Sequence, residues 1–255
     1  MFCLRLACGL IAALVLFSPS LVNPRFYRVH FLTALGLTAV AAFFGREQVG
    51  GWLWGALAVL VLAFVGSLAW SVEGAPGGKV LIGLTSLALA TTLVLASQAF
   101  YPNGTIALDL PSTTNLAGMI VDDLSAAAVL GTAMTAMLMG HSYLIAPSMS
   151  LVPLRRLLAG LFGALLVRSA LAASGLVSWT EGHSLINLEN ETVLWLPLRW
   201  GVGLLAPLVL GWMAREAAKI RSTQSATGIL YVVVICCFLG ELTSQLLFSN
   251  TGYIL

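Results

Sequence analysis

Three ionisable residues lie deep inside long apolar runs of this 255-residue chain, and their types could support proton or anion chemistry. Glu241, Arg168 and Arg199 each lie in a different run. Ionisable side chains at membrane depth are costly, so they usually have partners and functions. A carboxylate can exchange protons, and guanidinium groups can stabilise negative charge on a ligand oxygen. We therefore predict that these three residues form a catalytic or binding site.

The composition indicates the elements that must position this site. Hydrophobic residues make up 59% of the chain and charged residues only 9%, whereas soluble domains average about 25% charged residues. Apolar runs of about 17–25 residues are typical of membrane-spanning helices. The sequence predicts an all-α, polytopic membrane helix bundle, forming a single integral membrane domain over residues 1–255. About eight transmembrane helices are expected, over residues 4–22, 29–45, 52–72, 80–100, 121–140, 157–178, 193–214 and 226–249.

Lysine and arginine in the short loops predict the orientation, because these residues favour the cytoplasmic side. Eight of them lie on one side, namely Arg25, Arg28, Lys79, Arg155, Arg156, Arg215, Lys219 and Arg221. Only Arg5 and Arg46 lie on the other side. We therefore expect a multi-pass protein of the cell inner (plasma) membrane with both termini outside the cytoplasm.

The first run, 4–22, also fits a secretory signal peptide, because Arg5 precedes a short apolar core. It has no clean small-residue cleavage site after that core. The first run is therefore predicted as a membrane helix.

Helical rise places the three charges at similar depth. At about 1.5 Å per residue, Arg168 lies roughly 17 Å deep, Arg199 roughly 9 Å below the outer face and Glu241 roughly 22 Å from the inner face. In a hydrocarbon core of about 30 Å, Glu241 and Arg199 are nearly level in the outer half. Two readings follow: a structural ion pair between helices, or an outward-facing polar pocket. The second is favoured by a surplus of one arginine, which needs another partner.

Four further residues are candidates for cofactor binding. Gln245 lies one helical turn outward from Glu241 on the same face. Trp200 follows Arg199 and could form a wall of the same pocket or a cation–π face. His30 and His141 are expected at the cytoplasmic ends of their helices, where they could ligate haem b or be plain interfacial residues. The four cysteines lack metal-ligand spacing, so no metal site is expected.

The last helix carries a short motif, Phe238-Leu239-Gly240-Glu241-Leu242, which is followed by Phe248. It resembles the last helix of eight-helix quinol-interacting membrane anchor subunits of the DMSO reductase and polysulfide reductase type. Arg199, the helix count and the expected outer termini are compatible with that family. An arginine common after the Gly-Glu-Leu step is replaced here by Ser244 and Gln245. The resemblance implies quinone chemistry near the outer face and electron transfer to iron–sulfur and molybdenum subunits.

Three functions are therefore considered. The first is an integral membrane subunit of a respiratory redox complex that interacts with quinone, with or without haem b. The second is a transporter for a small anion, coupled to a proton on Glu241. The third is an assembly or scaffold protein whose charges only hold helices together. Stand-alone enzyme activity is not expected, because no catalytic triad, phosphate loop or zinc motif occurs. The expected partners are the lipid bilayer and other subunits, not nucleic acid.

Overall fold

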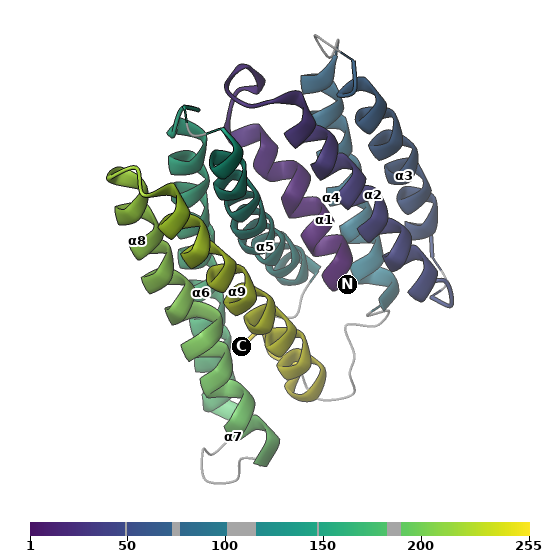
Figure 1. Ribbon diagram of the computed structural model, residues 1–255. Helices are drawn as coiled ribbons and strands as arrows, with labels where there is room; N and C mark the ends of the chain where they lie inside the picture. Colours follow the sequence, from purple (N-terminus) through teal and green to yellow (C-terminus); the bar gives the residue numbers. More distant parts are fainter. Residues whose placement is uncertain (49, 73–76, 101–115, 147, 183–189) are drawn as a thin grey trace.

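The protein is a bundle of long helices, seen in a computed structural model (Figure 1). The structure describes residues 1–48, 50–72, 77–100, 116–146, 148–182 and 190–255. No strand occurs in these ranges. The helices are α1 (Phe2–Ala13), η1 (Leu14–Leu16), η2 (Pro19–Leu21), α2 (Pro24–Phe44), α3 (Trp52–Ala69), α4 (Gly78–Phe100), α5 (Leu116–Ile145), α6 (Val152–Gly182), α7 (Asn190–Pro197), η5 (Leu198–Leu205), α8 (Ala206–Lys219) and α9 (Thr223–Thr251).

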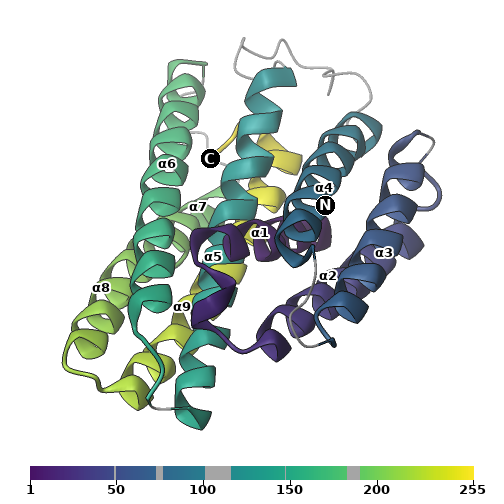
Figure 2. The same ribbon diagram turned by 90° about the horizontal axis from the view of Figure 1, so that it is seen from above.

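The helices pack as two groups that meet at α1 and α5. In the first group α1 contacts α2 and α4, and α3 lies against α2 and α4. In the second group α5 contacts α6 and α9, and α8 lies against the same two helices. Figure 2 shows α1 and α5 side by side between these groups. One hydrophobic core cluster includes residues from both groups, from Leu4 to Cys237.

Seven helical segments of the described chain are long and apolar enough to cross a membrane. They correspond to the second through eighth predicted runs, so the prediction of a polytopic helical membrane protein is confirmed at this level. Most helices extend several residues beyond the predicted apolar runs. The reason is physical: a helix continues into the polar interface, where its sequence is no longer apolar. The side of the membrane on which the termini lie stays a prediction.

The first predicted span differs from the structure. Residues 4–22 do not form one helix, because α1 ends at Ala13 and two short 3₁₀ turns follow. Pro19 prevents a continuous helix through this run, since the residue before a proline is driven out of the helical region. That residue, Ser18, has an extended backbone with φ −77° and ψ 139°. At about 1.5 Å per residue, the 12 residues of α1 rise only about 18 Å, too short for a core of about 30 Å.

Helix α1 is an interior helix. Nine of its 12 residues are buried. Its packing depends on a glycine pair at the crossing with α5. A Cβ on Gly9 would lie 1.8 Å from the carbonyl oxygen of Ala127, and one on Gly131 would lie 1.9 Å from the carbonyl carbon of Gly9. The two backbones are therefore in direct contact, as small residues permit in membrane helices.

The α1–α5 crossing yields the first prediction. Gly131→Ala would force the two helices apart and should lower the free energy of unfolding by about 1–3 kcal/mol, as overpacking does. Gly36→Ala is the matched control, because a Cβ on Gly36 meets nothing within 4 Å. The control should be neutral or slightly stabilising, since alanine is the better helix former. Thermal unfolding in detergent measures both, and equal stability of the two variants would contradict this packing.

Candidate functional site

The three predicted charges meet in one place. Arg168 of α6 donates from Nε and Nη2 to the two carboxylate oxygens of Glu241 on α9, both at 2.9 Å. Arg199 of η5 donates from Nη1 to Oε1 of Glu241 at 3.2 Å and to the carbonyl of Gly240 at 3.0 Å. All three side chains are at most 1% exposed. The structure thus brings the three residues together, and the bidentate Arg168–Glu241 pair is among the stronger hydrogen-bonded ion pairs. Their catalytic or binding role stays a prediction.

The network is larger than the sequence indicated. Arg5 of α1 donates from Nε to Asp123 at 2.6 Å and from Nη2 to Asp122 at 2.8 Å. Asp122 also accepts from Nη1 of Arg168, and Asp123 accepts from the hydroxyl of Ser97 on α4. We call Arg5, Asp122, Asp123, Arg168, Arg199 and Glu241 the ion network. Arg5 lies within the first predicted run, 4–22, where a lone arginine in an apolar segment is a sign of a buried partner.

The predicted surplus of one positive charge is wrong. Among the described residues the ion network holds three arginines and three carboxylates, so its formal charges balance. Asp122 and Asp123, which lie at the start of the predicted run 121–140, supply the two additional negative charges. A balanced, hydrogen-bonded network offsets much of the cost of desolvating its members. The surplus argument for an anion or ligand pocket beside Glu241 therefore no longer holds.

An irregular helix positions Arg199. Residues 198–205 form a π-helix, in which the amide of Ala206 donates to the carbonyl of Gly201. Pro207 follows, and it has no amide hydrogen with which to continue an α-helical ladder. One turn beyond Arg199, a Cβ on Gly203 would lie 2.5 Å from the Cα of Gly240. This backbone contact holds η5 against α9, so that Arg199 reaches Glu241.

The residues after α9 close the same site. Gly252 adopts the left-handed conformation with φ 76°, which ends the helix and turns the chain back. The carbonyl of Leu255 then accepts from Nε of Arg199 at 3.2 Å and from the hydroxyl of Ser244 at 3.3 Å. Nothing in the residue types of 252–255 predicts that this segment folds back onto the site.

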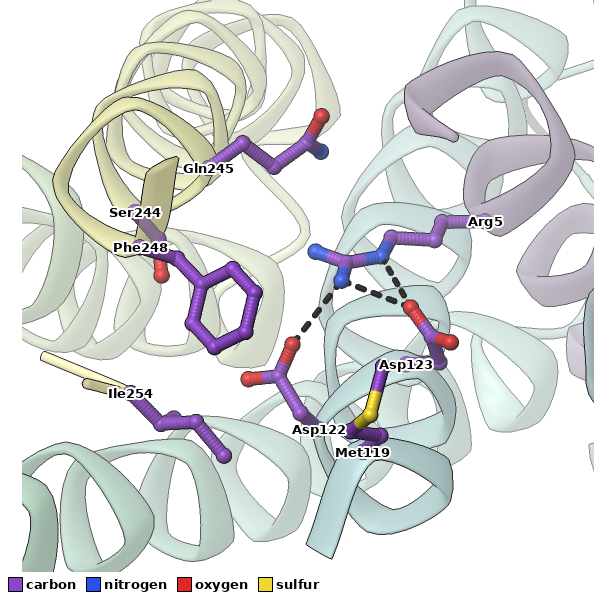
Figure 3. A pocket seen from close by; sticks show the side chains of 8 residues that line it. All are labelled: Arg5, Met119, Asp122, Asp123, Ser244, Gln245, Phe248 and Ile254. Atoms are coloured by element: carbon purple, nitrogen blue, oxygen red, sulfur yellow. Dashed lines mark hydrogen bonds and ion pairs between the residues drawn. The ribbon is translucent and has the colours of Figure 1, made fainter. Parts of the chain in front are cut away.

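Little space remains beside the ion network. Figure 3 shows Arg5 between the two aspartates and Gln245, with Phe248 pointing into the remaining gap. The cavity measures about 20 Å³, which is room for a single water molecule. Gln245 lines it, as predicted for a residue near Glu241. Trp200 does not line this cavity, and its indole Nε1 is buried without a hydrogen-bond partner among the described residues.

The two histidines lie at a second place. His30 of α2 and His141 of α5 both line a cavity of about 330 Å³, together with Phe26, Leu138 and other mainly apolar residues. We call it the histidine cavity. On α5, His141 is 19 residues from Asp122, about 28 Å along the helix. The predicted cofactor-binding residues are therefore divided between two distant sites.

Comparison of the chain with protein-family models, curated proteins and solved structures finds no match. The resemblance to quinol-interacting anchor subunits therefore stays a prediction.

The balance of the ion network yields the second prediction. Glu241→Gln removes one negative charge from a buried cluster and should cost about 3–5 kcal/mol of stability, because two arginines lose their shared partner. The matched control is Glu216→Gln, which breaks an exposed pair with Lys219 at 2.6 Å and should cost under about 1 kcal/mol. Thermal unfolding in detergent compares them.

A double variant tests whether charge balance is the cause. Arg168→Met with Glu241→Met removes one charge of each sign and leaves the rest of the network balanced. We expect this double variant to lose less stability than the sum of its two single variants, by about 1–3 kcal/mol. Additive losses would show that the residues act independently.

Proposed function

We propose that this protein is an integral membrane subunit that binds the headgroup of a quinone in the histidine cavity. The observation that carries the proposal is the cavity itself. Its volume of about 330 Å³ falls within the roughly 300–1,000 Å³ of small-molecule sites. Its lining combines apolar walls with a few polar groups, which is the usual make-up of such sites. The space beside Glu241 has no such volume.

The chemistry of His30 fits a quinol hydroxyl. Its Nδ1 lies 2.8 Å from the carbonyl oxygen of Phe26, and since a carbonyl only accepts, Nδ1 carries the hydrogen. In the neutral ring Nε2 is then an acceptor, and it is buried without a partner in the described part of the chain. The ring of Phe26 lies 4.3 Å from the imidazole, centroid to centroid. An acceptor beside an aromatic wall suits a hydroxylated ring.

His141 gives the cavity a second titratable group. It lies on α5, is exposed and lines the cavity opposite the α2 residues. A quinol bound between the histidines could hydrogen-bond one imidazole directly and release protons through the other, which faces water. Oxidation of the quinol to the quinone would release two protons and two electrons, and the electrons would pass to an iron–sulfur centre of another subunit. The protein would therefore act as part of a complex and not as a stand-alone enzyme.

In this proposal the ion network has a structural role, whereas the sequence predicted a catalytic or binding site there. Its six charged groups hold α1, α5, α6, η5 and α9 in one arrangement, which is the scaffold function considered from the sequence. Direct quinone chemistry at Glu241, Arg168 and Arg199 is the competing assignment. Anion transport gains no support from a surplus arginine, because the network's charges balance.

The third prediction concerns quinone binding. Titration of the purified protein with a short-chain quinol, followed by tryptophan fluorescence, should give saturable binding. His30→Leu should weaken it about five- to tenfold, which corresponds to one lost hydrogen bond of about 1–1.5 kcal/mol. Gln245→Leu is the matched control from the ion-network end and should leave the affinity unchanged.

If Gln245→Leu weakened quinol binding and His30→Leu did not, the quinone site would lie at the ion network. If the protein showed no saturable quinol binding, the proposal would be refuted. A dithionite-reduced minus oxidised spectrum completes the test. A b-type signal that disappears in both His30→Leu and His141→Leu would assign the cavity to haem b in place of quinone.

A further inference from the structure

A third cavity lies where α1 stops short of the bundle end. It measures about 290 Å³ and is lined by Leu14, Val15, Phe17 and Ser18 from the segment after α1, and by Lys79 of α4 and Arg156 of α6. The short helix η1 contacts α1, α4 and α6, so the cavity lies among three elements far apart in sequence. Neither the ion network nor the histidine cavity shares a residue with this lining.

The short first helix explains why this space exists. Arg5 is fixed in the ion network, which fixes the depth of α1. From Arg5 the helix descends only eight residues to Ala13, about 12 Å. With Glu241 roughly 22 Å from the opposite face, α1 ends about 10 Å before that face. The longer helices α4 and α6 continue past this point and leave a hollow between them.

The charges around the hollow are of one sign. Lys79 and Arg156 are both exposed, and no acidic residue of the described chain lines the cavity. Lys79 forms no salt bridge within the described ranges. Arg156 donates from Nη1 to the carbonyl of Leu16 at 3.4 Å, which leaves other guanidinium hydrogens for a ligand. Lys79 is the second residue of α4 and so lies in the first turn, where the helix dipole also favours an anion.

We propose that this hollow binds the phosphate headgroup of an anionic phospholipid. The phosphate lies between the ammonium of Lys79 and the guanidinium of Arg156, with the hydroxyl of Ser18 as a further donor. Arginine suits phosphate oxygens by its planar fork, and lysine binds them as a point charge.

The apolar part of the lining favours a lipid over free phosphate. Leu14, Val15 and Phe17 border the hollow, and Val15 is 67% exposed on the outside of the bundle. Leu14 and Phe17 are almost fully buried, so the exposed side chain of Val15 supplies the apolar surface for the first part of an acyl chain. Basic pockets between helices on the cytoplasmic side are typical sites for anionic lipids, and Lys79 and Arg156 belong to the side predicted as cytoplasmic.

The test uses the full-length protein in detergent and native mass spectrometry with phosphatidylglycerol and phosphatidylcholine. The unaltered protein should bind phosphatidylglycerol preferentially. Lys79→Gln with Arg156→Gln should reduce that preference about 25-fold, because each of the two cations beside the headgroup contributes about a factor of five. The control, Arg215→Gln with Lys219→Gln, removes two cations from α8 and should keep the preference. All four residues are exposed, so folding is expected to survive and is checked by thermal unfolding.

Three results would overturn the proposal. The first is an unchanged preference in the Lys79 and Arg156 double variant, and the second is an equal loss in the α8 control. The third concerns the source of the phosphate: millimolar inorganic phosphate that displaces phosphatidylglycerol from the unaltered protein would identify a free-phosphate site. Retained lipid under that competition, together with its loss in the double variant, supports the lipid site.

Discussion

The structure depends on keeping six charged side chains inside a medium of low dielectric constant. Separately, each of these groups would be too costly to bury. Together they balance, and each arginine spans more than one helix: Arg168 joins α6 to α5 and α9, Arg5 joins α1 to α5, and Arg199 joins η5 to α9. The arrangement of five helical segments is therefore coupled to charge neutrality, since a shift of any one would leave a charge without its partner.

Close backbone contact makes this arrangement geometrically feasible. Two glycine pairs flank the ion network, Gly9 with Gly131 and Gly203 with Gly240. Arg5 lies about one helical turn from Gly9, and Glu241 follows Gly240 directly. Each helix crossing therefore sets the position from which a charged side chain extends to its partner. The π-helical turn and the folded-back segment after Gly252 add the last contacts. Packing and electrostatics are thus coupled, because the charged side chains reach their partners only where two helix backbones come close together. Such close approach requires glycine at the crossing.

The two ends of the bundle consequently differ. The end that holds the ion network is filled by protein, with room for one water molecule beside Arg5. The other end contains two cavities of about 330 and 290 Å³, which share no lining residue. Ligand binding is therefore proposed at the end opposite to the one that the odd carboxylate first suggested, while the rigid network positions the helices that form the cavities.

The sequence by itself determined the class of fold, because a membrane helix must be apolar for about 20 residues and composition records this directly. It also determined that Arg168, Arg199 and Glu241 lie at a similar depth, since helical rise is constant. Only the tertiary structure decided that Arg5 and the two aspartates join them, that the first run breaks near Pro19, and that His30 and His141 share a cavity. Those outcomes depend on helix rotation and on which helices are neighbours. Neither is encoded in hydropathy, because every face of a membrane helix can be apolar.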